Sequence, residues 1–116
     1  MKTLNQYEKI FKALSDKNRL RILKMLQRRS LCVCEITEIL KLAASTVSKH
    51  LSVLRETGFI TDWKEGKWIN YKINPEPEQL ISNALLYIQL QIVEDETIIN
   101  DRKLIECVDR NILCCK

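Results

Sequence analysis

The stretch from Leu31 to Leu54, LCVCEITEILKLAASTVSKHLSVL, carries two short apolar patterns separated by a few residues. The residues that recur at spacings of three and four are Ile36, Ile39 and Leu40 in the first part and Val47, Leu51 and Leu54 in the second. Such spacings place apolar side chains on one face of an α-helix. The stretch therefore predicts two short helices joined by a tight connection, a helix-turn-helix.

The second of these helices carries small, polar and basic residues outside its apolar face. They are Ser45, Thr46, Ser48, Lys49 and His50. Hydroxyls and a cation on such a helix can reach phosphates and base edges, because no bulky side chain holds the helix away from the groove. The pattern favours a helix that enters the major groove of double-stranded DNA. For the lone His50, a phosphate or packing contact is favoured over base reading.

A second possible DNA contact follows directly after this helix. Residues 59–73, FITDWKEGKWINYKI, place aromatic and β-branched residues on both sides of a polar turn, which is typical of a β-hairpin. A hairpin attached to a helix-turn-helix forms a wing. Lys64 and Lys67 at its tip are expected to reach an adjacent groove or the DNA backbone.

The rest of the chain predicts further helices around this unit, in a single domain over residues 1–116. The expected class is mainly α with a β-hairpin wing. The expected helices cover residues 4–14, 16–28 with Ser15 as N-cap, 30–40, 44–57, 76–93, and a last one ending near Leu113 with Cys107 inside it. The helices over 4–14 and 76–93 are the expected two-fold dimer interface; the alternative is that the tail, about 95–116, packs on its own subunit.

The charge is unevenly distributed along the chain. Residues 1–72 hold 15 Lys and Arg against 7 Asp and Glu, whereas residues 73–116 hold 4 against 8. A basic front and an acidic back suit a protein that presents one side to a polyanion, although chance scatter of surface charge is the alternative. No apolar run is long enough to span a bilayer and the start lacks a secretion signal, so a cytoplasmic protein without a membrane partner is expected.

Five cysteines give the chain a possible chemistry. They are Cys32, Cys34, Cys107, Cys114 and Cys115. An odd number without an export signal argues against a disulfide framework and favours metal ligands or redox sensors, with buried core thiols as the alternative. Thiolates select soft ions, which favours trivalent arsenic or antimony, then cadmium or lead. Arsenic(III) accepts three sulfurs, so one of the three tail cysteines, from either subunit, is expected to join Cys32 and Cys34.

The spacing of Cys32 and Cys34 suggests a switch. On a regular α-helix, residues i and i+2 lie about 200° apart around the axis, so two sulfurs cannot face one ion. Ion binding is then expected to distort the start of the helix against which the DNA-contacting helix packs. This would couple ion binding to DNA release.

Four segments together resemble the ArsR family of arsenic- and metal-responsive transcriptional repressors. They are ALSDKNRLRIL (13–23), LCVCE (31–35), STVSKHLSVLRETGFI (45–60) and GKWINYKI (66–73). The resemblance covers about residues 5–92. It implies a homodimeric winged helix that binds palindromic operator DNA when ion-free and leaves it when the inducer binds. It also places Cys32 and Cys34 at the inducer site.

The chain departs from the family pattern at two positions. Thr37 stands where arsenite-sensing members often have a third cysteine, and Ala43 stands where a serine commonly caps the DNA-contacting helix. The family's Asp/His site on the last helix is not available, because His50 is the only histidine.

The sequence therefore predicts a homodimeric repressor that arsenite or antimonite releases from its operator, without an organic cofactor. A cadmium- or lead-responsive repressor of the same fold and a thiol redox or sulfide sensor are the alternatives. Enzyme activity is not expected, because the chain has no C-x-x-C, no phosphate-like anion loop and no Gly-rich turn.

Overall fold

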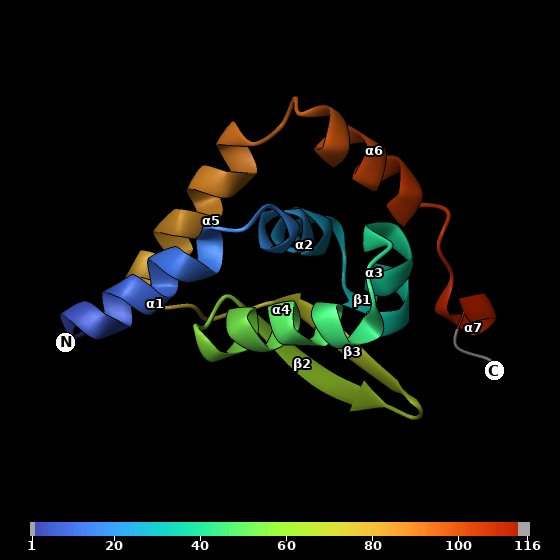
Figure 1. Ribbon diagram of the computed structural model, residues 1–116, viewed down its shortest axis with the longest axis horizontal. Coiled ribbons are helices and arrows are strands. Elements are labelled where there is room, and N and C mark those ends of the chain that lie inside the picture. The colour runs from blue at the N-terminus through green and yellow to red at the C-terminus, as the bar shows by residue number, and fades with distance from the viewer. Residues whose placement is uncertain (1, 114–116) are drawn as a thin grey trace.

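The computed structural model describes residues 2–113, which form several helices and a small antiparallel sheet at one side of them (Figure 1). The helices are α1 (Leu4–Leu14), α2 (Lys17–Arg28), α3 (Val33–Leu40), α4 (Ala44–Glu56), α5 (Gln79–Gln91), α6 (Glu96–Ile105) and α7 (Arg110–Leu113), and the strands are β1 (Leu31–Cys32), β2 (Ile60–Glu65) and β3 (Trp68–Ile73). This confirms the expected class, mainly helical with a β-hairpin wing. No helix within residues 2–113 is long and apolar enough to cross a membrane.

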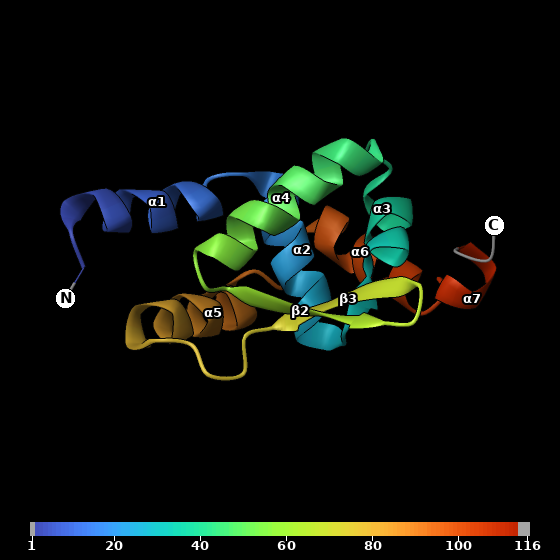
Figure 2. The same cartoon turned by 90° about the horizontal axis from the view of Figure 1, so that it is seen from below.

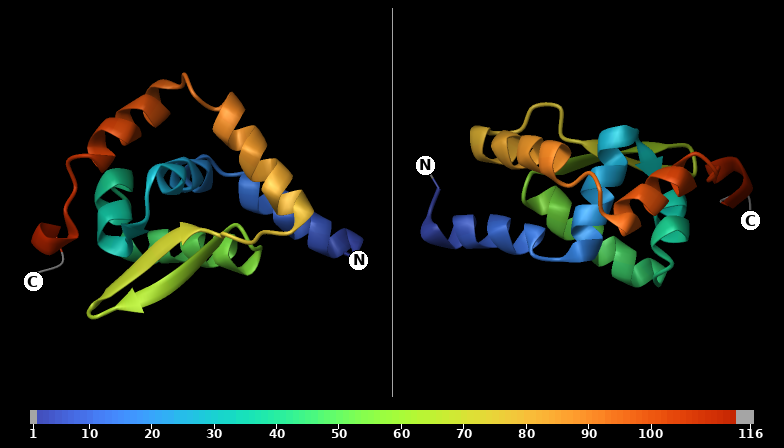
Figure 3. Two further views of the ribbon diagram at one scale, coloured as in Figure 1. Left: turned by 180° about the vertical axis from the view of Figure 1, so that it is seen from behind. Right: turned by 90° about the horizontal axis from the view of Figure 1, so that it is seen from above.

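Helix α2 is the centre of the core. It lies between α5 and α6 on one side and α4 and the sheet on the other (Figures 1 and 3). Its residues Ile22, Leu23 and Met25 are almost fully buried, and Phe59 and Leu54 reach the same core from the end of α4. The core thus holds the helix-turn-helix and the hairpin as one body.

The N-cap of α2 differs from the expected residue. Ser15 ends α1, and Asp16 caps α2 by accepting hydrogen bonds from the backbone N–H groups of Asn18 and Arg19 at 2.8 and 3.1 Å. A carboxylate at this position satisfies two otherwise unpaired N–H groups and interacts favourably with the helix dipole, which a serine hydroxyl does less well.

The expected hairpin is present, and the sheet has one additional strand. Strands β2 and β3 pair from Ile60 with Ile73 to Glu65 with Trp68, and Gly66 at the turn adopts a φ of 60°. The two-residue strand β1 pairs with the other edge of β3, which gives the strand order β1-β3-β2. The segment that carries Cys32 is therefore hydrogen-bonded directly to the wing.

The tail does not form one continuous helix. Helix α6 ends at Ile105, Cys107 lies in the turn that follows, and α7 begins only at Arg110. The expected helix through Cys107 to Leu113 was therefore wrong. Helix α6 packs against α2 and α3 of its own chain, whereas α1 and α5 extend at the same end of the molecule (Figure 2).

The helix-turn-helix is confirmed as α3 followed by α4. Only residues 41–43 connect them, and Lys41 adopts the left-handed conformation with φ 56° and ψ 41°. Ala43 is the N-cap of α4 and its side chain offers no hydrogen-bond acceptor to the first turn. Gly58, with φ 92°, follows the end of α4.

The alanine cap leads to a stability prediction. Ala43→Ser is expected to stabilise the protein by about 1 kcal/mol, because a serine hydroxyl can accept a hydrogen bond from a free N–H group of the first turn. For a domain of this size the melting temperature should rise by roughly 4 °C. Thermal unfolding followed by circular dichroism measures this. Ala44→Ser, one residue later, is the matched control and should give no gain; an equal gain in both variants would contradict the capping explanation.

Candidate thiol site and nucleic-acid interface

Cys32 lies at the junction of the sheet and the helix-turn-helix. It is the last residue of β1 and the N-cap of α3, with an extended backbone at φ −85° and ψ 165°, and its side chain is fully buried. Its backbone N–H donates to Glu35 Oε1 at 2.9 Å. Because Glu35 is three residues later, Cys32 and Glu35 occupy the positions of a capping box.

This position corrects the expected geometry of the cysteine pair. Cys32 precedes the helix, and only Cys34 is in its first turn. The angle of 200° between residues i and i+2 applies only within a helix, so the argument that the pair must break a regular turn was wrong. What constrains Cys32 is instead its backbone pairing with Asn70 of β3 and its burial in the core.

The surroundings of Cys32 disfavour its thiolate form. Burial is the main factor that raises the pKa of the Cys32 thiol, and the negative charge of Glu35 adds to it. Glu35 is in turn held by Arg29, whose Nη2 lies 3.4 Å from Glu35 Oε2 and donates to the Ile105 carbonyl at 2.9 Å. A soft ion that binds the thiolate would therefore have to displace a proton from a buried site.

The other cysteines are placed differently. Cys34 is half-buried and disulfide-bonded in this structure, so experiments on thiolate ligands need reduced protein. Cys107 is exposed and shares a cavity of about 240 Å³ with Glu38 and Lys41, farther along α3. Cys114 and Cys115 lie outside the described residues. Within residues 2–113, no three His, Cys, Asp or Glu side chains are grouped so that they could hold a metal ion.

Helix α4 presents the expected polar face. Ser45, Thr46, Ser48 and Lys49 are exposed, while Val47, Leu51 and Leu54 on the opposite face are buried. His50 is half-buried, and its Nδ1 lies 3.1 Å from Arg19 Nη1. Arg19 also donates to the Ala13 carbonyl at the end of α1. The histidine therefore serves as a packing contact between α4 and the start of α2.

The wing is fixed by a contact that the sequence did not indicate. Lys64 and Lys67 at its tip are exposed as expected. Next to the turn of the hairpin, the Arg110 guanidinium from α7 lies 4.1 Å from the centre of the Trp68 ring, 2.6 Å from Glu65 and 2.8 Å from Asn70 Oδ1. The hydrogen bond from Arg110 is the main reason that the pKa of Glu65 is lowered.

Sequence reasoning missed both Glu35 and Arg110. The C-x-x-E spacing of Cys32 and Glu35 resembles the usual S/T-x-x-E capping signal and could have revealed the N-cap. No local pattern connects Arg110 to a hairpin some 40 residues earlier, because the contact depends on how the tail folds back.

Comparison with known proteins places these features in a family. Residues 16–62 match the family described as "Bacterial regulatory protein, arsR family". A Bacillus subtilis protein named "Arsenical resistance operon repressor" is 42% identical over 74 residues, which are 63% of this chain and 70% of that one. The chain belongs to the ArsR family.

The names of two further relatives refer to resistance to different elements. A Pseudomonas putida protein named "Arsenic resistance transcriptional regulator" is 39% identical over 66% of this chain, which spans only 60% of that relative. A Staphylococcus aureus protein named as a homologue of a cadmium resistance transcriptional regulatory protein is 38% identical over 68% of this chain and 67% of its own. The comparisons thus support a regulator of metal or metalloid resistance without fixing the ion.

Solved structures agree on the fold. A solution structure from Mycobacterium bovis, titled a homodimeric winged helix-turn-helix DNA-binding domain of a possible ArsR-family regulator, is 25% identical. It superimposes with a TM-score of 0.64 over 75% of this chain and 78% of its own. The winged helix-turn-helix is thereby confirmed for this ArsR-family chain.

Proposed function

We propose that this ArsR-family protein is a homodimeric repressor. It binds operator DNA through α4 and the wing, and it leaves the operator when arsenite or antimonite binds Cys32 and Cys34. A third sulfur comes from Cys107, Cys114 or Cys115 of either subunit. Soft thiolate ligands and a DNA-suited helix in one small domain are the basis for this proposal.

One observation carries the proposal: the cysteine pair is connected to both DNA-contacting elements. Cys32 pairs through its backbone with Asn70 in β3 of the wing. Cys34 lies in the first turn of α3, which packs against α4. A change at the pair can therefore be transmitted to the DNA-contacting helix and to the hairpin at the same time.

Ion binding would act on these connections because the Cys32 thiol is fully buried. For its sulfur to share an ion with Cys34 and a third cysteine, the start of α3 and the β1–β3 pairing must shift. The ion and the operator then favour different conformations, and each weakens binding of the other. Such couplings are typically about 1–3 kcal/mol, or 5- to 150-fold in affinity.

The dimer interface is proposed on α1 and α5. These helices expose large apolar side chains: Leu4, Phe11, Leu86, Tyr87 and Leu90 are each more than half exposed. Large apolar side chains exposed on two helices at one end of the molecule suit a protein contact (Figure 2). A two-fold dimer would bury both helices and set the spacing of two α4 helices for successive major grooves, about 34 Å apart.

Charges on this face are expected to separate the subunits. The double variant Leu86→Glu/Leu90→Glu places two carboxylates one helical turn apart on α5, where dimerisation would bury them without partners. Sedimentation velocity should show a monomer, and operator affinity should fall at least about tenfold because two half-sites no longer bind together. Gln91→Glu, which adds a single carboxylate at an exposed polar position of the same helix, is the control and should leave the dimer intact. A double variant that stays dimeric would place the interface elsewhere.

The inducer is tested by operator binding. Fluorescence anisotropy of a labelled operator, with fully reduced protein, is titrated with arsenite, antimonite, cadmium, lead and zinc at equal free concentrations. The proposal expects release by arsenite or antimonite at the lowest concentrations. Release by cadmium or lead alone would favour the cadmium-type alternative, and binding unaffected by any ion would overturn the proposed inducer.

The disulfide-bonded form of Cys34 favours a thiol redox sensor as the second candidate function. Oxidation of a thiol to a disulfide would then replace ion binding as the signal. The same operator assay separates the two. Release by an oxidant in metal-free buffer, reversed by a reductant, would support redox sensing.

A further inference from the structure

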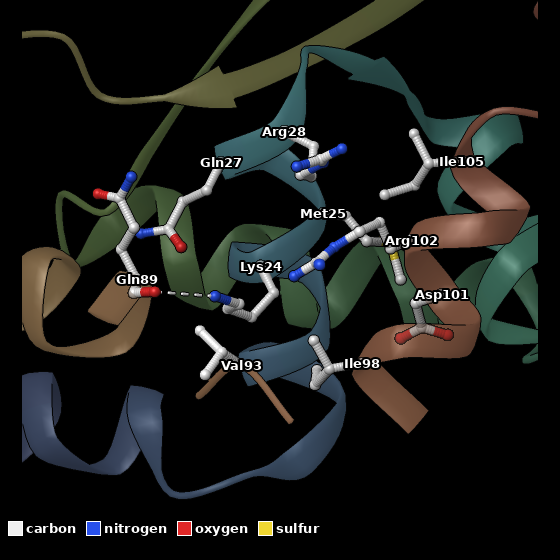
Figure 4. A pocket seen from close by; sticks show the side chains of 10 residues that line it. All are labelled: Lys24, Met25, Gln27, Arg28, Gln89, Val93, Ile98, Asp101, Arg102 and Ile105. Carbon is white, nitrogen blue, oxygen red and sulfur yellow. Dashed lines mark hydrogen bonds between the residues drawn. The ribbon is translucent and has the colours of Figure 1, made fainter. Parts of the chain in front are cut away.

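A cavity of about 190 Å³ between α2, α5 and α6 is lined by three cations (Figure 4). Lys24 and Arg28 lie one turn apart on α2, and Arg102 comes from the last turn of α6. The cavity is lined by different residues from those around the cysteines and the exposed face of α4. It therefore needs an explanation separate from ion sensing and DNA binding.

The carboxylate in the cavity wall does not balance these charges. Asp101 is held by Arg21, whose Nε and Nη2 lie 2.8 and 2.9 Å from its two oxygens. This pair is neutral as a unit, and the Asp101 side chain is only 4% exposed. Within residues 2–113, neither Arg28 nor Arg102 forms an ion pair, so three positive charges remain uncompensated around the cavity.

Lys24 is fixed in position although its charge is disfavoured there. It is 9% exposed, and its Nζ donates to the carbonyls of Ile88 and Gln89 near the end of α5 at 3.4 and 3.3 Å. Burial is the main factor that lowers the pKa of Lys24, and the positive charges of Arg102 and Arg28 lower it further. An anion between the three cations would remove this repulsion.

A second observation points to the kind of anion. Gln27 is another residue that lines the cavity, and its Oε1 atom is buried without a hydrogen-bond partner among the described residues. Its amide nitrogen is already used, donating to the Leu85 carbonyl at 2.9 Å. A buried acceptor of this kind needs a donor, which a ligand hydroxyl could supply.

We infer that the cavity between α2, α5 and α6 binds a small oxyanion that carries a hydroxyl group. Lys24, Arg28 and Arg102 hold the negatively charged oxygens by charge-assisted hydrogen bonds, and the hydroxyl donates to Gln27 Oε1. Monohydrogen phosphate combines negative charge with a hydroxyl donor. A small hydroxy acid does the same, with its carboxylate as the charge and its hydroxyl as the donor. Because the ligand touches α2 and α6 together, it strengthens the docking of the C-terminal helix.

Isothermal titration calorimetry tests the site with three probes at constant ionic strength: inorganic phosphate, sulfate and lactate. Phosphate or lactate should bind one per chain with saturation, and sulfate, which has no hydroxyl at neutral pH, more weakly. Whichever of phosphate and lactate binds with the higher affinity shows whether the ligand is a phosphate or a hydroxy acid. If the heats for all three probes are linear and do not saturate, the whole inference is wrong. If sulfate binds as tightly as phosphate and lactate, the proposed hydroxyl contact to Gln27 is wrong.

Two variants and a matched control show whether the binding belongs to this cavity. Arg28→Gln and Arg102→Gln should each weaken binding at least about tenfold, since each removes a charged hydrogen-bond donor. Lys103→Gln removes the same charge from the adjacent residue of α6, which does not line the cavity, and should change binding less than twofold. Equal losses in all three variants would mean nonspecific attraction. Without the anion, Arg102→Gln should unfold at the same or a higher temperature, because it relieves repulsion.

Discussion

Replacing Cys32 or Cys34 by serine is expected to abolish operator release by arsenite or antimonite within the range that releases the intact protein. A hydroxyl does not replace a thiolate as a ligand for a soft ion, so each variant loses a direct bond to the inducer. We expect the midpoint of release to rise at least ~100-fold, since loss of even an indirect contact to a bound metal costs 10- to 100-fold. Anisotropy of the labelled operator, titrated with arsenite, measures the midpoint.

Two controls make this experiment decisive. Operator affinity without ion is measured first, because serine in the fully buried position of Cys32 can itself destabilise the start of α3. Glu38→Gln, on the exposed side of α3 one turn after Cys34, should leave the midpoint unchanged. If both cysteine variants respond like the intact protein, the ion does not bind this pair. Single Ser variants of Cys107, Cys114 and Cys115 then identify the third sulfur.

Asp101→Asn is expected to cause a large loss of stability. The Asp101 carboxylate is 4% exposed and accepts hydrogen bonds from Nε and Nη2 of Arg21, whose side chain is 19% exposed. The variant leaves Arg21 with an uncompensated charge in a mostly buried position, which costs about 3–5 kcal/mol. The melting temperature should fall by at least roughly 10 °C. Thermal or urea unfolding at one protein concentration measures the effect.

An exposed ion pair provides the matched comparison. Arg55 and Asp62 lie 3.0 Å apart, but their side chains are 48% and 31% exposed, so Asp62→Asn should cost less than about 1 kcal/mol. The double variant Arg21→Met/Asp101→Leu should recover most of the stability lost in Asp101→Asn, because it removes both charges. If Asp101→Asn costs no more than Asp62→Asn, the pair does not hold α6 on α2.

The features that sequence reasoning predicted well depend on neighbours close in the chain. The apolar spacing of α1 and the alternation around Gly66 are local signals, and both elements match the structure closely. The exposed hydroxyl face of α4 follows from the same periodicity. Local signals of this kind also sufficed for the helix-turn-helix and its wing.

The features that were missed depend on contacts between distant residues. Strand β1 has only two residues, too few for any alternation, and it exists because Leu31 and Cys32 meet Tyr71 and Asn70. This pairing draws Cys32 out of the helix and invalidated the helical argument for the cysteine pair. The break between α6 and α7 was hidden because apolar residues continue through Val108 and Ile112. The position of the third sulfur remains a prediction.

The short link between the two helices of the DNA-contacting unit limits how the protein can respond. Residues 41–43 span at most about 10 Å even when extended, and Lys41 is the only residue other than glycine with positive φ among the described residues. With so short a link, α4 cannot move independently of α3. A tilt of α3 that begins at the cysteine pair should therefore rotate α4 as a rigid body against the base edges. Inserting a few flexible residues into the link should leave the affinity for DNA largely intact but make that affinity insensitive to the inducer.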